Sequence, residues 1–152
     1  MKVACPSCGY TAPLTAFANE AEARESLALA MRMPSALYKP MMQYLVLFRP
    51  AKQLLRWSRV RNLLGELVCC IEAGQIERHS RTWVAPAEHW KAALEVVLNQ
   101  QDKLTLPLKD HGYLFQILAS MANKDEAIKE AKQEQARQHA AQGKRQGMSH
   151  LS

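Results

Sequence analysis

The longest regular pattern in the chain lies between Pro50 and Gly74. Apolar residues recur there mostly at steps of three and four, which is the spacing of one face of an α-helix. Pro50 suits a first helical turn, and Gly74 suits the left-handed residue that follows a helix. The pattern therefore predicts a long helix over 50–73, whose inward face consists of Leu54, Trp57, Val60, Leu64, Leu67, Val68 and Ile71.

The same helical period recurs on both sides of this segment, divided by prolines. Asn19 is expected to cap the first helix and Asp110 the last, because short polar side chains accept bonds from free backbone N–H groups. Pro40 breaks the second stretch into a single turn over 36–39 and a helix. The predicted helices span 19–33, 40–48, 86–99 and 111–122.

Residues 75–84 change the period of the pattern. Ile76 and Val84 flank a polar tip, with Trp83 beside the second of them. Two short apolar runs around a polar tip are typical of a β-hairpin. We expect two strands here, with His79-Ser80-Arg81 at or near the turn. The predicted fold is therefore mainly α, with one β-hairpin.

Size and composition favour one domain with an appendage. The chain has 152 residues, of which 48% are hydrophobic, and this is enough to bury a sizeable core. No apolar run approaches the length of a membrane span, and no apolar signal-peptide region follows Lys2. We therefore expect a cytoplasmic protein without membrane contact. In that reducing compartment the four cysteines would not form disulfides.

A tight turn at the N-terminus resembles one knuckle of a zinc ribbon. Cys5-Pro-Ser-Cys8 is followed by Gly9, and Cys-x-x-Cys is a spacing that zinc sites use. The segment lacks the βαβ setting of a redox pair. Structural zinc takes four ligands, and no second Cys-x-x-Cys follows. In-chain candidates for the remaining ligands are Cys69, Cys70, His79 and His111.

The candidate ligands within the chain could have other roles. A second copy of the chain could supply the third and fourth zinc ligands instead. Cys69 and Cys70 are neighbours on a predicted helix, so their side chains diverge, and both suit small buried positions. His111 could cap a helix or pack beside Tyr113. Alternatively, the knuckles of two chains in a homodimer share one ion, which needs only Cys5 and Cys8 from each chain.

Positive charge is concentrated in the segment from Ser26 to Gly65. It contains no acidic residue, and its seven basic residues are Arg32, Lys39, Arg49, Lys52, Arg56, Arg59 and Arg61. Such a segment attracts polyanions or acidic protein surfaces. The simpler interpretation is a solvated basic face, balanced by acidic faces packed nearby.

The order of helices, long basic helix, hairpin and helix is that of a winged-helix domain. In this interpretation the helix over 50–73 enters the major groove of DNA, and 75–84 forms the wing. Arginine and lysine can contact phosphates or guanine edges, and glutamine can contact adenine. The predicted DNA-contacting residues are Arg49, Lys52, Gln53, Arg56, Arg59, Arg61, Arg78 and Arg81, with His79 near the wing tip.

The C-terminal region differs from the rest in composition. Residues 124–142 are rich in Ala, Glu, Lys and Gln and favour a helix, but they carry almost no apolar stripe after Ile128. We expect a solvated or partner-dependent helix, followed by a disordered basic tail over 143–152. The predicted domains are a zinc knuckle over 1–18, a winged-helix-like body over 19–123 and this tail over 124–152.

The sequence contains none of the common catalytic motifs, such as Gly-x-Ser-x-Gly, a Walker A loop or His-Glu-x-x-His. We therefore expect that the protein is not an enzyme. Of three hypotheses for its function, a small metal-dependent enzyme ranks third. The first is a DNA-binding accessory protein. The second is a protein-interaction module that presents its basic segment to an acidic protein surface.

Two stretches, 74–90 and 106–115 (Leu-Pro-Leu-Lys-Asp-His-Gly-Tyr-Leu-Phe), are similar to those of small uncharacterised proteins encoded in phage and prophage early regions. The resemblance covers most of the chain. It implies a role in phage replication or early regulation, in the cytoplasm of a bacterial host. The C-terminal helix would then recruit a replication protein such as a helicase or initiator. In the second hypothesis, the protein would bind and redirect or inhibit a host complex.

Overall fold

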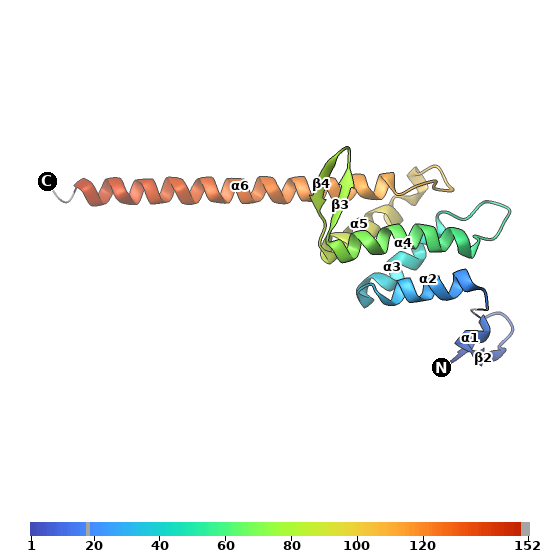
Figure 1. The fold of residues 1–152 in the computed structure, drawn as a ribbon. Coiled ribbons are helices and arrows are strands. Elements are labelled where there is room, and N and C mark those ends of the chain that lie inside the picture. Colours follow the sequence, from blue (N-terminus) through green and yellow to red (C-terminus); the bar gives the residue numbers. More distant parts are fainter. Residues whose placement is uncertain (18, 150–152) are drawn as a thin grey trace.

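The structure is a computed structural model that describes residues 1–17 and 19–149, and it is mainly helical (Figure 1). Two small antiparallel hairpins accompany the helices. The strands are β1 (Lys2–Ala4), β2 (Thr11–Pro13), β3 (Gln75–Arg78) and β4 (Arg81–Val84). The helices are α1 (Leu14–Phe17), α2 (Ala21–Met31), α3 (Tyr38–Val46), α4 (Trp57–Ala73), α5 (Ala87–Asn99) and α6 (Gly112–Ser149), with single 3-10 turns at η1 (Ser35–Leu37) and η2 (Gln101–Lys103).

The core lies among α3, α4, α5 and the first turns of α6, and α2 lies along the outer side of α4 (Figure 1). Trp90 is the largest fully buried side chain, and its indole N–H donates to the carbonyl of Ala85 over 3.1 Å. Burying each large apolar side chain stabilises the fold by about 1.5–3 kcal/mol. The other large, fully buried side chains are Leu37, Met41, Tyr44, Leu67, Val68, Ile76, Leu94, Val97, Leu114 and Leu118.

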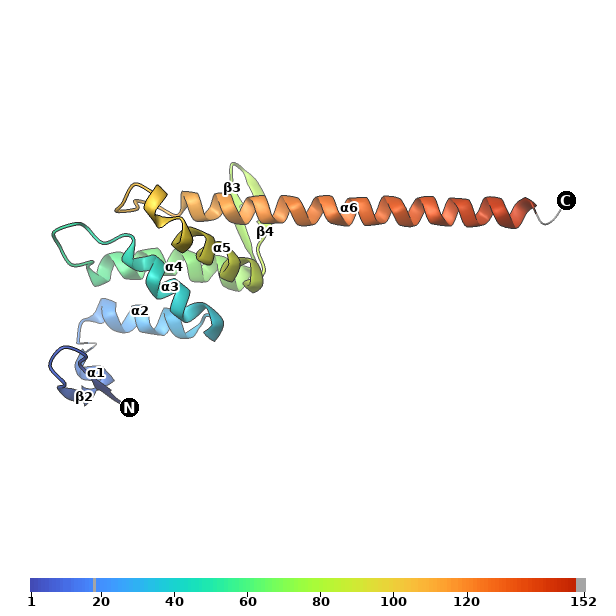
Figure 2. The same cartoon turned by 180° about the vertical axis from the view of Figure 1, so that it is seen from behind.

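The predicted hairpin at 75–84 is confirmed. Strands β3 and β4 pair from Gln75 with Val84 to Arg78 with Arg81, so the turn consists of His79 and Ser80. Both turn residues have positive φ angles, of 50° and 60°, as a two-residue turn that follows the twist of the strands requires. Ile76 is buried, and the hairpin lies beside α6 in both views (Figures 1 and 2).

The helix predicted over 50–73 begins seven residues later, at Trp57, and ends as expected before a left-handed Gly74. Residues 50–56 are therefore not helical, and the prediction for them was wrong. Leu54, which was assigned to the inward stripe, is 81% exposed. The reason is tertiary: Phe48 is anchored in the core after α3 ends, so the next residues must cross to the start of α4.

The starts of the second and third helices of the structure also differ from the predicted ones: α2 begins at Ala21 and α3 at Tyr38. Helix α2 begins at Ala21 with Glu20 as its N-cap, so Asn19 does not cap it. Pro40 lies within the first turn of α3, where a missing backbone N–H costs no hydrogen bond.

The predicted helices over 111–122 and 124–142 are one helix, α6, which projects far beyond the body (Figure 2). The tail predicted to be disordered over 143–152 is helical through Ser149, and its last three residues lie outside the described residues. No helix in 1–17 or 19–149 is both long and apolar enough to cross a membrane.

Candidate nucleic-acid interface and metal-binding turn

Two loops meet at one end of the helical body, on the right in Figure 1. The first connects α3 to α4, and the second connects α5 to α6. The backbone N–H of Leu108 donates to the carbonyl of Leu47 over 2.9 Å, and the guanidinium of Arg59 donates to the carbonyl of Lys109 over 2.6 Å. These contacts gather basic residues from both loops and from the start of α4. We call this group the basic end: Arg49, Lys52, Arg56, Arg59, Lys103 and Lys109.

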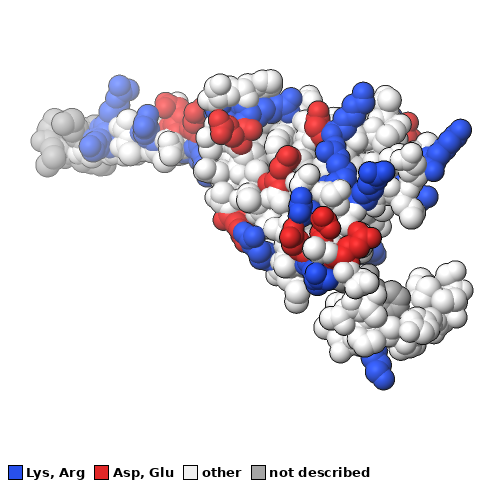
Figure 3. Space-filling view, turned by 45° about the vertical axis from the view of Figure 1, so that its right-hand side comes forward, with Lys and Arg blue, Asp and Glu red and all other residues white. Residues whose placement is uncertain are grey.

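Two carboxylates lie next to the basic end in the chain, because Asp102 precedes Lys103 and Asp110 follows Lys109. All six basic side chains belong to exposed residues, and none forms an ion pair within 1–17 or 19–149. Arg49 donates to the carbonyl of Gln53 over 3.4 Å, and Arg59 to that of Lys109. Carbonyls are neutral, so both positive charges remain. Lys and Arg side chains stand out from this end of the body, above a group of acidic side chains nearer the N-terminal hairpin (Figure 3).

Apolar and acidic groups border the basic end. Leu54 is 81% exposed and Trp57 is 40% exposed, so an aromatic face is available beside the cations. Glu20, Glu22 and Arg56 line a shallow cleft together with these two residues. The acidic pair therefore bounds the positive surface on the side of α2.

The other predicted DNA-contacting arginines bind groups of this chain. Arg61 pairs with Glu25 over 3.0 Å. Arg78 donates to the carbonyl of Gly112 over 2.8 Å. Arg81 pairs with Glu126 over 2.9 Å and also lies over the ring of Trp83. Both hairpin arginines thus face α6. The predicted Gln53 lies in the first loop of the basic end, where it is exposed.

The N-terminal knuckle is a hairpin turn between β1 and β2. The N–H of Cys5 donates to the carbonyl of Tyr10, and the N–H of Gly9 donates to the carbonyl of Cys5, both over 2.8 Å. Gly9 takes a φ of 75°, which favours glycine. The backbone N–H groups of Cys8 and then Ser7, followed by the Cys8 thiol, lower the pKa of the Cys5 thiol. Donors that stabilise a thiolate are what a thiol metal ligand requires.

The other proposed zinc ligands lie elsewhere and have other surroundings. Cys69 is exposed and Cys70 is half-buried on α4, where burial raises the pKa of the Cys70 thiol. His79 lies in the β3–β4 turn. His111 is 3% exposed, and both of its ring nitrogens have partners in the core. Within the described ranges, no three His, Cys, Asp or Glu side chains are grouped so that they could hold one metal ion.

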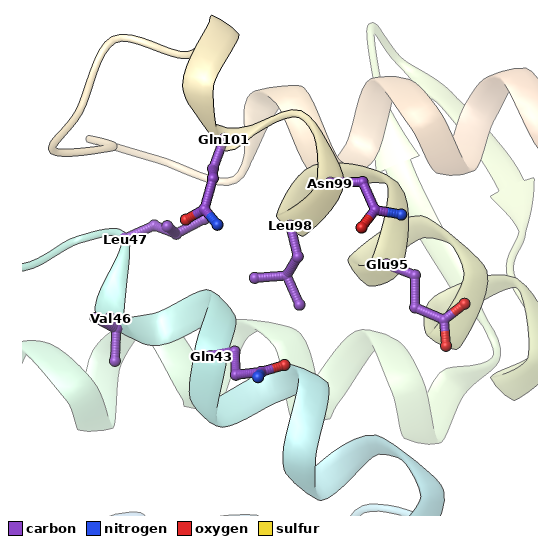
Figure 4. A pocket seen from close by; sticks show the side chains of 7 residues that line it. All are labelled: Gln43, Val46, Leu47, Glu95, Leu98, Asn99 and Gln101. Atoms are coloured by element: carbon purple, nitrogen blue, oxygen red, sulfur yellow. The ribbon is translucent and has the colours of Figure 1, made fainter.

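Three further hollows were not indicated by the sequence. The largest, about 620 Å³, opens between α3 and α5, and its lining carries side-chain amides and one carboxylate, that of Glu95 (Figure 4). These groups offer no nucleophile and no acid–base pair. An apolar groove of about 190 Å³ lies between α2 and α3, beside the exposed Met31 and Met42. The third lies between the hairpin tip and α6, where Trp83 Nε1 is buried without a hydrogen-bond partner among the described residues.

The fold and these surfaces define a small, mainly helical protein with a Cys-x-x-Cys hairpin turn near its N-terminus and a basic surface at one end of the body. Residues 1–110 match the model of the family HI_1489_N, described as an N-terminal domain. The match spans most of the chain, so the chain belongs to this family. It begins at the knuckle and ends just before α6. No curated protein and no solved structure matches the chain.

Proposed function

We propose that this protein is a non-enzymatic DNA-binding accessory protein that contacts DNA through the basic end. The observation that carries the proposal is a group of six exposed cations, five from two loops and Arg59 from the start of α4, none of them paired with a carboxylate among the described residues. Arg59 joins the start of α4 to the second loop through its hydrogen bond to the carbonyl of Lys109, and Leu108 joins the two loops through its bond to Leu47. A cluster of unpaired cations on a folded surface favours a polyanion as its ligand.

The local geometry supports contacts with phosphates more than contacts with base edges. Lys52 and Arg56 lie before α4, so this helix does not present them to a major groove as a recognition helix would. The first turn of α4 contains no acidic residue, and its free N–H groups add a partial positive charge that favours phosphate. Trp57 offers a face for an unpaired base. We therefore expect strong salt dependence and weak sequence preference.

The proposed cellular role follows from the resemblance to phage early-region proteins. Helix α6 extends well past the core, and from Asn123 to Gly147 every residue is exposed. Such a helix would recruit a replication protein, such as a helicase or initiator, to DNA held at the basic end. Early regulation is the other role that this resemblance implies. Both would operate in the cytoplasm of a bacterial host.

The test compares two variants that remove equal charge from different surfaces. The first is Lys52→Gln with Arg56→Gln and Lys103→Gln, at the basic end. The second is Lys129→Gln with Lys132→Gln and Arg137→Gln, on the exposed part of α6. Binding to a labelled DNA duplex at low salt should weaken about tenfold or more for the first variant. Equal weakening in both variants would show that net charge alone drives binding, and it would contradict the proposed site.

A second candidate function, a protein-interaction module that redirects or inhibits a host complex, is favoured by the groove between α2 and α3. Met31 is 76% exposed and Met42 is 70% exposed at this groove. Methionine side chains adapt to varied apolar partners. An amphipathic helix that lays its apolar face into the groove would suit this site. Met31→Glu with Met42→Glu should abolish partner binding and leave DNA binding unchanged; loss of DNA binding instead would contradict this role.

A further inference from the structure

The N-terminal hairpin has almost no apolar core of its own. Of its strand residues only Ala12 is buried. Met1 is 92% exposed, Val3 37% and Tyr10 65%. A two-stranded hairpin is at best marginally stable in water, and small modules without a core usually need a disulfide or a structural metal. The hairpin also lies beside the helical body and not within it (Figures 1 and 2).

The turn of this hairpin already has the arrangement of half a zinc site. Two residues separate Cys5 from Cys8 within one tight turn, which is the Cys-x-x-Cys spacing of zinc knuckles. The turn is closed by the hydrogen bonds between Cys5 and Tyr10 and between Gly9 and Cys5. These backbone bonds fix the turn that carries both thiols.

Among the residues that the structure describes, none near the two thiols completes the site. No third His, Cys, Asp or Glu joins the two thiols within the described ranges. The remaining cysteine pair lies in the last turns of α4, near Arg32 and Glu72. Arg32 follows the end of α2, whereas the knuckle precedes its start. The 11 residues of α2 span about 16 Å, so Cys69 and Cys70 lie about a helix length away.

We propose that two copies of the chain share one zinc ion, which Cys5 and Cys8 of each copy bind as four thiolate ligands. Four sulfur ligands complete the tetrahedral shell that structural zinc takes. A twofold axis through the ion makes the two knuckles equivalent, as in most homodimers. The exposed Met1, Val3 and Tyr10 provide apolar surface for the second copy to cover. This inference does not depend on DNA binding.

The experiment measures metal content and molecular mass together on the purified full chain. Zinc analysis should give one ion for every two chains, and light scattering should give twice the mass of the chain. Removing zinc with a chelator should return the protein to monomers, and adding zinc back should restore the dimer. Cobalt in place of zinc should saturate at half an equivalent, with the absorption of a tetrahedral thiolate site.

Two variants show which cysteine pair binds the zinc ion. Cys5→Ser with Cys8→Ser should remove both zinc and the dimer, while circular dichroism should show the helical body intact. Cys69→Ala with Cys70→Ala is the matched control, and it should retain zinc at the same ratio. One zinc ion per monomer, a dimer that persists without zinc, or zinc kept by the Cys5/Cys8 variant would each overturn the proposal.

Discussion

The hydroxyl of Tyr44 donates a hydrogen bond to Nδ1 of His111 over 2.8 Å, inside the helical core. On the other side of the ring, Nε2 lies 3.1 Å from the carbonyl of Leu63. A carbonyl only accepts, so Nε2 carries the proton and Nδ1 is the acceptor. The two bonds tie α3 and α4 to the residue that precedes α6. A neutral His111 therefore has a hydrogen-bond partner at each of its ring nitrogens.

This arrangement predicts that the protein loses stability as the pH falls below neutrality. Burial lowers the pKa of His111, against smaller opposing effects of the Leu63 carbonyl, Glu66 and Asp110; the charge of Arg59 lowers it further. In the unfolded chain a histidine has a pKa of about 6.5. The unfolded state therefore binds more protons once the pH falls to that range, and stability declines until the folded pKa is passed.

The measurement is the thermal unfolding midpoint from pH 7.5 to pH 5. His111→Gln has no titratable ring and can still form hydrogen bonds, so its midpoint should change less over this range than that of the wild type. The His111→Gln protein should also be less stable at pH 7.5, because a glutamine amide does not reproduce the geometry of the two hydrogen bonds that the ring of His111 forms with Tyr44 and Leu63. An unchanged pH dependence in this variant would show that His111 is not responsible.

Replacing the two residues of the β3–β4 turn should increase the stability of the protein. His79 and Ser80 have φ angles of 50° and 60°, a region that costs most residues about 1 kcal/mol. Asparagine followed by glycine favours this turn. His79→Asn with Ser80→Gly should therefore raise the free energy of unfolding by about 1 kcal/mol in urea denaturation. The same pair placed at Asp102 and Lys103, in the η2 turn, should give no such gain; equal effects would contradict the account.

The far part of α6 should contribute little to the stability of the body. Every side chain from Asn123 to Gly147 is exposed, and Ile128 among them is 52% exposed. A chain ending at Ile128 keeps the ion pairs of Asp125 with His89 and of Glu126 with Arg81. Its free energy of unfolding should change by less than about 0.5 kcal/mol, while its helical circular dichroism signal falls.

A shorter truncation provides the contrast for that experiment. A chain ending at Gln116 loses Leu118 and Ala122 from the core. Loss of a buried leucine side chain alone costs about 2–5 kcal/mol, so this chain should be strongly destabilised. Equal effects of the two truncations would show that the part of α6 beyond Ile128 also stabilises the body, which would contradict this prediction.

Local patterns allowed much of the fold to be predicted. The change to a two-residue period at Ile76 located the hairpin, and Gly74 located the end of α4, because both signals act within a few residues. The start of α4 could not be predicted in this way. It depends on Phe48 being held in the core, which is a contact between distant parts of the chain.

The charge pattern shows the same limit. The segment from Ser26 to Gly65 lacks acids, so its charge looked uncompensated throughout. In the structure, Glu72 binds Arg32 across 40 positions of sequence, and Glu25 binds Arg61 across 36. Lys103 and Lys109 also belong to the basic end, although they lie between α5 and α6, outside the basic segment of the sequence. Pairing and clustering of charges depend on tertiary proximity, which local composition does not contain.

The salt dependence of DNA affinity tests most directly whether the basic end binds DNA phosphates. Six phosphate contacts predict a slope of about −5 in log affinity against log salt, and a loss of about a thousandfold between about 50 and 200 mM salt. Fluorescence anisotropy with a labelled duplex and the wild-type chain gives this slope. A steep slope that becomes shallower by about three in Lys52→Gln/Arg56→Gln/Lys103→Gln agrees with the account. A flat slope, or no binding at the lowest salt, would contradict it.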